Sequence, residues 1–420
     1  MAVFLLATLD TKATEAAFVR DRLIEHGASV TLVDCGCLGE SPVTADISRD
    51  AIFAAAGTSL AGSRNRADRG AAVNAAAAGA ARIVREAYGR GEVEGVVALG
   101  GSAGTTIGTA AMRALPIGIP KLMVSTLASG QVRPWVGDKD ICMLNSVVDI
   151  AGINRIGRAV LGQAAAAMAG MVRHAASNPK SPIPNPKSDK PLIAATMFGV
   201  TTPCVQHARA ILESAGYEVL VFHATGNGGQ AMESLIRDGL IAGVLDITTT
   251  ELADELVGGI LSAGPTRLTA AGEMGIPQVV SVGALDMVNF GPRDSVPAKF
   301  AGRKFHVHNA SVTLMRTTPE ENAKLGEEIA RKLAAAKGPT VLMLPLQGLS
   351  AIDRPGQPFD EPAARAALYD ALRRNRGPVE LIELDNHIND LEFAETAART
   401  LLRLLTGKKS RTEAQRHREL

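Results

Sequence analysis

The stretch AVFLLATLDTK (2–12) begins as a run of apolar residues and ends in threonine, aspartate and lysine. About 190 residues later, PLIAATMFGVTTP (191–203) likewise begins with apolar residues and ends in threonines and a proline. A short apolar run of this kind predicts a buried strand of a parallel sheet. Ligands of parallel α/β sheets bind outside the carboxyl ends of the strands, so two such stretches predict two ligand-facing crevices.

The order of elements that follows is also repeated. The first half continues with GVVALGGSAGTTIG (95–108) and PKLMVSTLASG (120–130), and the second with AGVLDITTTELAD (242–254) and PQVVSVGALDM (277–287). Helical segments separate these strands, and such alternation predicts parallel sheets with right-handed crossovers. We therefore predict an α/β fold of two Rossmann-like domains with mainly parallel sheets, related by tandem duplication.

A proline-rich segment divides the two halves. SNPKSPIPNPKSDKP (177–191) contains five prolines, which cannot donate backbone hydrogen bonds and favour an extended linker. We predict an N-terminal α/β domain over residues 1–176, a C-terminal α/β domain over 192–406, and a charged, solvated tail over 407–420.

Within the first half, the residues around the predicted strands indicate the other elements. We expect helices over residues 11–26, 70–90 and 145–173 and from about Thr105, a polar excursion over 36–69 above the binding edge, and a long loop through Trp135. In the second half we expect strands at LIAATM, EVLVFHA, GVLDIT, PQVVSV, TVLMLPL and VELIELD, and a regular helix over 318–338.

Composition excludes several classes of partner. The 44 Lys and Arg against 43 Asp and Glu leave a net charge of +1, so no global field attracts nucleic acid or an anionic membrane. Only 3% of the residues are aromatic, which leaves few platforms for stacking of bases. The N-terminus lacks a basic signal region, and no apolar run is long enough to span a bilayer. We expect a cytoplasmic protein with no nucleic-acid or membrane partner.

The four cysteines fit this location. Cys35, Cys37, Cys142 and Cys204 show neither a disulfide framework nor the paired spacing of a structural zinc site. We predict that they are reduced, buried thiols.

The loop GGSAGTT (100–106) could bind an anion. It lies between a predicted strand and helix, where Gly100, Gly101 and Gly104 let the backbone approach closely and the helix N-terminus presents free N–H groups. The loop matches neither the P-loop pattern nor a strict GxGxxG, so tight helix–strand packing is the alternative explanation of its glycines.

Two further loops of the first half lie at strand ends. TLDTK (8–12) supplies Lys12 for phosphate charge and Asp10 as a candidate Mg²⁺ ligand, although Asp10 or Thr11 could simply cap the next helix. STLASG (125–130) adds Ser125, Thr126, Ser129 and Gly130. Because all three loops follow strands of one sheet, they predict a phosphate or nucleotide site.

The strand ends of the second half carry acidic and histidine side chains. His223 ends one strand, Glu251 follows another, and HVHN (306–309) places His306 and His308 on one face of an extended segment. That pair could ligate a metal or simply form hydrogen bonds in a cleft. DNHIND (385–390) could supply His387 as a general acid or base, or it could cap the next helix.

One arginine of the second half could bind an anion. Arg267, in GPTRLTAAGEMGIP (264–277), could clamp a carboxylate or phosphate with two hydrogen bonds, or bridge the domains.

Long motifs spread over residues 1 to about 405 carry a family resemblance. They are TLDTK, GGSAGTT, STLASG, DICMLNSVVDIAGIN (140–154), TTTELAD, GPTRLTAAGEMGIPQVVSVGALDMVNFGP (264–292), HVHNASVTLMRTT (306–318), PLQGLSAID (345–353) and DNHINDLEFA (385–394). In these motifs the chain resembles a largely uncharacterised bacterial family that is similar to the ATP-binding N-terminal region of the tomato mosaic virus resistance protein.

This resemblance implies two α/β subdomains, ATP with Mg²⁺ as the ligand, and self-association as a homodimer. The nucleotide-binding motif then maps onto Thr8, Asp10, Thr11, Lys12, Gly100, Gly101, Ser102, Gly104, Thr105, Ser125, Ser129 and Gly130. We expect Asp10 to hold the metal, and Lys12 with the loop amides to hold the phosphates. The first half is the preferred location because its loops carry Lys12 and the glycine-rich helix start together.

A second hypothesis is an enzyme of small-molecule metabolism. It would be a lyase, hydrolase or isomerase whose active site lies between the halves. Its catalytic residues would be His223, Glu251, His306, His308 and His387. Both hypotheses can hold together, with ATP as substrate or effector.

Overall fold

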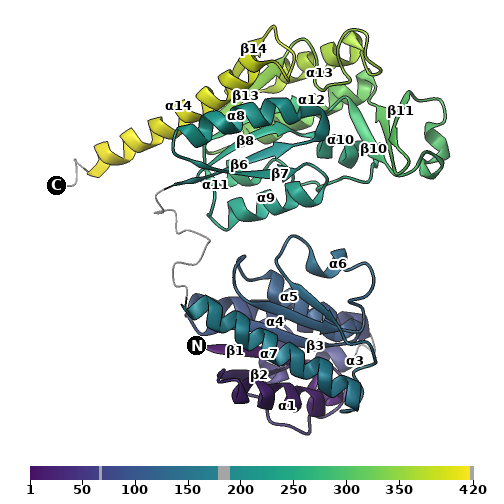
Figure 1. Cartoon of the computed structure of the whole chain (residues 1–420), viewed down its shortest axis with the longest axis vertical. Helices are drawn as coiled ribbons and strands as arrows, with labels where there is room; N and C mark the ends of the chain where they lie inside the picture. The colour runs from purple at the N-terminus through teal and green to yellow at the C-terminus, as the bar shows by residue number, and fades with distance from the viewer. Residues whose placement is uncertain (66–68, 178–189, 417–420) are drawn as a thin grey trace. The chain divides into compact units, whose positions relative to one another are not determined.

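The computed structural model describes residues 1–65, 69–177 and 190–416. The chain forms two compact units, Met1–Ile183 and Pro184–Leu420 (Figure 1). Most of the predicted linker over 177–191 lies outside the described residues.

The first unit is built on a five-stranded parallel sheet with the strand order β2-β1-β3-β4-β5. At its centre, Leu5 pairs with Leu32 on one side and with Val97 on the other. The three central strands, β1, β3 and β4, are almost fully buried, because helices cover both faces of the sheet. The five strands of the sheet are β1 (Ala2–Ala7), β2 (Val30–Asp34), β3 (Val93–Gly100), β4 (Lys121–Ser125) and β5 (Cys142–Asn145).

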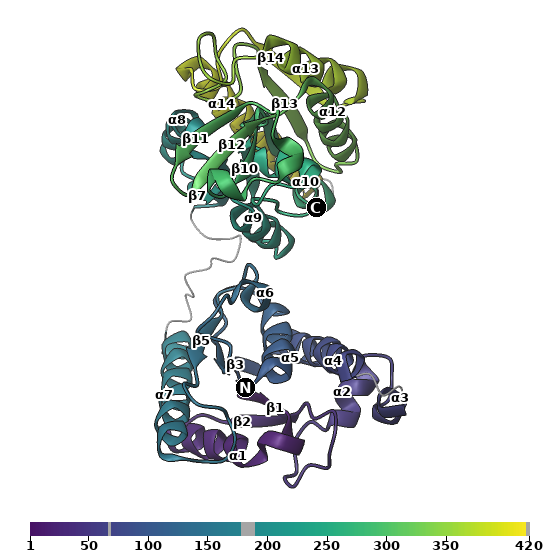
Figure 2. The same ribbon diagram turned by 90° about the vertical axis from the view of Figure 1, so that its right-hand side faces the viewer.

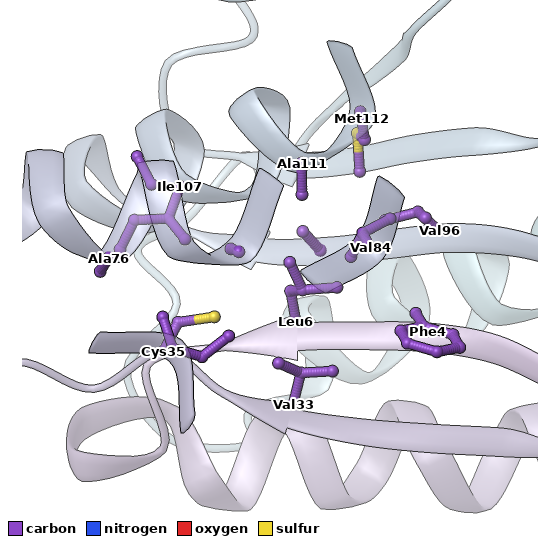
Figure 3. Close-up of a cluster of buried hydrophobic side chains, with 14 of the residues drawn as sticks. Phe4, Leu6, Val33, Cys35, Ala76, Val84, Val96, Ile107, Ala111 and Met112 are labelled. Atoms are coloured by element: carbon purple, nitrogen blue, oxygen red, sulfur yellow. The ribbon is translucent and has the colours of Figure 1, made fainter. Parts of the chain in front are cut away.

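Helices α1 (Leu9–Glu25) and α7 (Arg155–Ser177) cover one face of this sheet, and α4 (Arg69–Gly89) and α5 (Ser102–Arg113) cover the other. Figure 2 shows the sheet between these two layers. The core under α4 and α5 contains Phe4, Leu6 and Ile107 (Figure 3). Small residues on the helices allow the close approach. A Cβ added to Gly108 of α5 would lie 2.5 Å from the Cβ of Ala98 on β3.

The excursion after β2 is more ordered than we predicted. It contains α2 (Arg49–Ala55) and α3 (Leu60–Asn65), and Ile47 forms a parallel bridge with Val33 at the edge of the sheet. The prediction of a helix over 145–173 was wrong at its start, because residues 142–145 form β5 and α7 begins at Arg155. A four-residue strand is too short for a periodic pattern to reveal it. Cys142 on this strand is exposed, whereas the other three cysteines are buried as expected.

The second unit is built on a six-stranded parallel sheet with the strand order β14-β13-β9-β8-β6-β7. In this sheet β7, β6, β8, β9 and β13 take the places that β2, β1, β3, β4 and β5 take in the first sheet. The sixth strand, β14, is added at the edge beside β13. The common order confirms the predicted α/β fold of two Rossmann-like units. The strands are β6 (Leu192–Met197), β7 (Glu218–His223), β8 (Gly243–Thr248), β9 (Gln278–Gly283), β13 (Thr340–Pro345) and β14 (Glu380–Leu384).

Helices again cover both faces of this sheet. One face packs against α8 (Thr202–Ser214) and α14 (Leu391–Arg416). The other face packs against α9 (Asn227–Arg237), α10 (Thr250–Val257), α11 (Ala270–Met274), α12 (Pro319–Ala334) and α13 (Pro362–Asn375). A capping box fixes the start of α12, since Thr318 and Glu321 each accept a hydrogen bond from the other's backbone N–H.

A small antiparallel sheet interrupts the repeated order after β9. It contains β10 (Met287–Phe290), β12 (Val312–Arg316) and β11 (Phe305–Asn309) in that order. Our prediction covered the extended HVHN segment but not the sheet itself. Its strands are four or five residues long, and β10 is buried along its whole length, so no alternation of polar and apolar residues marks it.

The start of the predicted charged tail is helical, because α14 continues to Arg416. None of the helices in the described part of the chain is long and apolar enough to cross a membrane.

Candidate functional site

The two loops most strongly predicted to bind an anion follow adjacent strands of the first sheet. β1 and β3 are neighbours, but β1 leads into α1 on one face and β3 leads into α5 on the other. The two connections therefore diverge at the carboxyl edge of the sheet. This divergence is a topological switch point, where α/β folds place their ligand crevice.

Helix α5 begins at this crevice without a side-chain cap. Its N-cap residue is Gly101, and its first turn contains no acidic residue. A Cβ added to Gly101 would have only the Thr126 hydroxyl within 4 Å, at 3.7 Å, so the space in front of the helix is open. The first amides of a helix carry partial positive charge and favour an anion.

Lys12 lies in the first turn of α1, directly after β1. The turn is distorted there, with φ of −129° and ψ of 22° at Lys12. The side chain is partly exposed, and no carboxylate among the described residues forms an ion pair with it. Its ammonium group is therefore available to a ligand.

Asp10 is largely occupied by the chain itself. Its Oδ2 accepts hydrogen bonds from the backbone N–H groups of Leu38 and Gly39, at 2.7 and 3.2 Å. Its Oδ1 lies 3.4 Å from the Thr11 hydroxyl. Asp10 thus fastens the excursion after β2, a role different from the helix cap considered for it. Its Oδ1 accepts only the long hydrogen bond from Thr11, and the described residues contain no group of three metal-ligating side chains.

Thr105 and Ser125 join two of the predicted loops. Both are fully buried, and their hydroxyl groups lie 2.7 Å apart. Thr105 also donates to the carbonyl of Gly101, and Ser125 accepts from the N–H of Leu127. These hydroxyls hold the loops in place, whereas Ser102, Ser129 and Gly130 are exposed at the edge.

The glycines of GGSAGTT also differ in role, since two of them are required by tight packing and one faces open space. A Cβ on Gly100 would lie 2.8 Å from the Cα of Gly104, and one on Gly104 would lie 2.9 Å from the carbonyl oxygen of Leu99. Tight packing therefore explains Gly100 and Gly104, and Gly101 alone faces open space.

Asp34, which we did not single out from the sequence, also supports the crevice. It ends β2, and its Oδ1 accepts from the N–H groups of Leu9 and Gly36, at 3.1 and 2.8 Å. The available signal was an acidic residue at the end of the second strand, where dinucleotide-binding folds place one.

The corresponding switch point of the second unit, between β6 and β8, is filled by its own side chains. The hydroxyls of Thr201 and Thr248 lie 2.8 Å apart across it, and Thr196 donates to Asp246 at 2.7 Å. All four residues are buried.

Arg267 lies at the centre of this filled region. Its guanidinium donates to both oxygens of Asp246, at 2.6 and 2.7 Å, and to Glu251 at 2.7 Å. The arginine therefore clamps carboxylates of its own unit. Glu251 also accepts from the N–H groups of Gly226 and Gly229, so both its oxygens are engaged. Burial raises the pKa of Glu251, and Arg267 opposes that shift. A catalytic role for Glu251 stays a prediction.

His387 is also fully engaged. Its Nε2 lies 2.8 Å from the carbonyl oxygen of Ser350, and its Nδ1 accepts from the N–H of Asn389 at 3.1 Å. Since a carbonyl only accepts, Nε2 carries the proton and the ring is neutral. Burial lowers its pKa. The Ser350 hydroxyl donates to Asp286, so the three side chains do not form a nucleophilic relay.

The other predicted histidines are nearer the surface. His223 is exposed, and its ring lies 5.4 Å from the ring of Phe198 with the two planes tilted by 39°. His306 meets Phe359 edge-on at 6.3 Å, and His308 is exposed at an irregular position of β11. None belongs to a three-residue metal group in the described chain. Their catalytic role in a site between the halves stays a prediction.

Known proteins match the chain along nearly its whole length. A model of the N-terminal domain of the uncharacterised protein family UPF0261 matches residues 1–177, and a model of its C-terminal domain matches residues 190–405. A UPF0261 protein of Clostridium tetani is 49% identical over 405 residues, covering 96% of this chain and 98% of that protein. The UPF0261 protein of Mesorhizobium japonicum is 45% identical over 399 residues, with 94% and 97% covered.

A plant protein matches a shorter part. The ToMV resistance protein Tm-1(GCR237) of Solanum lycopersicum is 48% identical over 314 residues. The match covers 74% of this chain and 41% of the tomato protein.

Proposed function

We propose that this chain, which belongs to the uncharacterised protein family UPF0261, binds ATP with Mg²⁺ at the carboxyl edge of its N-terminal sheet. The phosphates would lie in the crevice between the loops after β1 and β3. Lys12 would neutralise phosphate charge from one side, and the first amides of α5, after Gly101, would donate from the other.

The switch point between β1 and β3 is the observation that carries this proposal. It combines the uncapped start of a 12-residue helix with a lysine that forms no ion pair in the described part of the chain, and the two follow the adjacent strands β3 and β1. Backbone amides and an ammonium group are donors without acceptors of their own, so they suit a ligand rich in anionic oxygens. In the described residues of the second unit, threonine hydroxyls and the Arg267 cluster fill the corresponding switch point.

The residues present fit a magnesium ion that arrives with the nucleotide. Mg²⁺ keeps several waters and commonly binds through one or two carboxylates together with phosphate oxygens. Asp10 has one carboxylate oxygen that no backbone amide occupies, at the start of α1. Bound there, the ion would offset phosphate charge, and the protein would contribute Asp10 Oδ1 as its ligand.

Calorimetric titration of ATP with Mg²⁺ into the full chain tests the proposal. The Lys12→Ala variant should bind at least about tenfold more weakly, because a charge-assisted hydrogen bond is lost. Lys324→Ala is the matched control, since Lys324 is exposed on α12 of the other unit. His308→Ala should also bind normally. Failure of the unmutated protein to bind would refute the proposal, and equal binding by Lys12→Ala would place the nucleotide elsewhere.

A further inference from the structure

The first unit contains a small cavity that is lined by α1, α7 and the segment 146–154, which joins β5 to α7. Its volume is about 10 Å³, which is room for a single sphere of the size of a water molecule. Glu15 of α1 and Ser146, Asp149 and Ile150 of the joining segment contribute to its wall. None of the described residues that we assign to the nucleotide lines it, so the cavity is a separate feature of the unit.

Glu15 is a buried carboxylate without a cationic partner. Its exposed fraction is 2%, and no Lys, Arg or His of the described chain lies within ion-pair distance of it. The backbone N–H of Gly152 donates to Oε1, and this is the only hydrogen bond that a described residue donates to the carboxylate. A buried carboxylate charge is costly unless an opposite charge compensates it. The cavity beside Glu15 is therefore the place where a cation would offset this cost.

The joining segment supplies further oxygen atoms for a cation. Asp149 lines the cavity and is itself exposed, and its carboxylate forms no hydrogen bond or ion pair with a described residue. The backbone carbonyls of Asp149 and Ile150 accept no hydrogen bond from a described residue. The described residues of the wall include neither histidine nor cysteine, which disfavours the softer transition metals. The wall therefore suits a hard cation that takes oxygen ligands.

The size of the cavity favours calcium over magnesium. Ca²⁺ accepts carboxylate and carbonyl oxygens in a flexible geometry, at about 2.3–2.6 Å. Mg²⁺ demands a near-ideal octahedron and gives up its waters reluctantly. A cavity with room for one water-sized sphere cannot hold a hydrated Mg²⁺ ion.

We propose that this cavity binds one Ca²⁺ ion, with Glu15 Oε2 and Asp149 as its charged ligands. Two carboxylates balance the charge of the ion, and backbone carbonyls of the joining segment together with water fill the other positions. The ion fastens α1 to the segment after β5. This segment is also held to the end of β4, since the N–H of Ser146 donates to the carbonyl of Ser125 at 3.2 Å. Calcium thus stabilises the first unit independently of any nucleotide.

Thermal unfolding and calorimetry of the metal-free full chain, without nucleotide, test this site. We expect CaCl₂ to bind at one ion per chain and to raise the Tm of the first unit by about 2 °C or more at saturation. MgCl₂ at the same concentration and NaCl at the same ionic strength should give less than about half of this rise. Absence of Ca²⁺ binding, or an equal rise with either comparison salt, would overturn the proposal.

Variants that remove one charge locate the ion. Glu15→Gln keeps an acceptor for the N–H of Gly152 but removes the buried charge, and it should weaken Ca²⁺ binding at least about tenfold. Asp149→Asn should weaken binding as well, and its exposed position keeps the test valid if Glu15→Gln does not fold. Glu25→Gln is the matched control, because Glu25 is an exposed glutamate at the end of the same helix.

The results for these variants decide the proposal. Full Ca²⁺ affinity in Asp149→Asn overturns it, and so does full affinity in a folded Glu15→Gln protein. Asp10→Asn should bind Ca²⁺ normally, because Asp10 does not line the cavity. Loss of binding in Asp10→Asn alone would place the ion at the start of α1 and would also overturn the proposal. Because no nucleotide is present, each of these results leaves the proposed ATP site to be judged by its own titration.

Discussion

Arg267 and Asp246 form a two-pronged ion pair in which neither residue is more than 1% exposed. The arginine also contacts Glu251 and, at 3.6 Å, Glu233. A buried guanidinium among three carboxylates compensates charges that water cannot reach. Removal of one member of such a cluster leaves the charges of the others buried and uncompensated, which destabilises the fold strongly. This holds even where the intact cluster adds little net stability compared with apolar residues.

We therefore expect Arg267→Met to lower the free energy of unfolding by about 3–5 kcal/mol. Arg267→Lys should fall between this variant and the unmutated chain, because an ammonium group keeps the charge but cannot reproduce the planar fork. Arg237→Ala is the control, since Arg237 lies at the exposed border of the same cluster. Urea unfolding followed by circular dichroism measures the effect. A loss below about 1 kcal/mol for Arg267→Met would contradict this account.

Two glycines of the first unit, Gly101 and Gly104, are expected to have different roles: one leaves space for a ligand, and the other allows tight packing. Gly101→Ala should leave stability nearly unchanged, because the added methyl group has only the Thr126 hydroxyl near it, at 3.7 Å. The same methyl group would lie in front of α5 and should weaken ATP binding. Gly104→Ala should instead destabilise the unit, by about 1–3 kcal/mol, because its methyl group would lie 2.9 Å from the Leu99 carbonyl.

Thermal unfolding and calorimetry on both variants measure these two effects. Normal ATP affinity in a stable Gly101→Ala protein would show that the phosphates do not approach the start of α5.

The arrangement of strands was predictable because each buried strand is a short apolar run with a change to polar residues at its end. AVFLLAT and LIAATM fall on β1 and β6. The same pattern predicted that the polar strand ends would meet at one edge of the sheet, and the loops after β1 and β3 do follow adjacent strands. The antiparallel sheet was not predictable, because strands such as β10, with four buried residues, carry no alternation.

The roles of individual polar residues were harder to predict. Glu251 and Arg267 are 16 residues apart, and Arg267 and Asp246 are 21 apart, so no local pattern links them. Asp10 is a residue type that commonly ligates metal ions. Its hydrogen bonds to Leu38 and Gly39, however, depend on where the segment after β2 packs, and the sequence around Asp10 does not indicate this. A sequence indicates which side chains reach a strand end, whereas burial and partners decide whether they support the loop or face the ligand.

Variants of His387 test whether this residue stabilises the fold or takes part in catalysis. Both its ring nitrogens are engaged within the chain, so His387→Ala should lower the free energy of unfolding by about 1–3 kcal/mol through the lost hydrogen bonds. His387→Gln should restore part of this, because its amide can donate to Ser350. ATP affinity should not change in either variant. His207→Ala is the control, since His207 is a partly exposed histidine paired with Glu395 at 3.4 Å.

The pH dependence follows from the lowered pKa of His387. The folded state binds its proton less readily than the unfolded state, whose pKa is near 6.5, so the contribution of His387 to stability is complete above about pH 6.5. It is lost as the pH falls through the lowered pKa. Unfolding measured from pH 8 down to pH 5 should therefore show a decline in the unmutated chain and in His207→Ala that is smaller in His387→Gln. An equal decline in all three proteins would show that the ring is not held neutral. Unchanged stability of His387→Ala would return the residue to the candidates for catalysis.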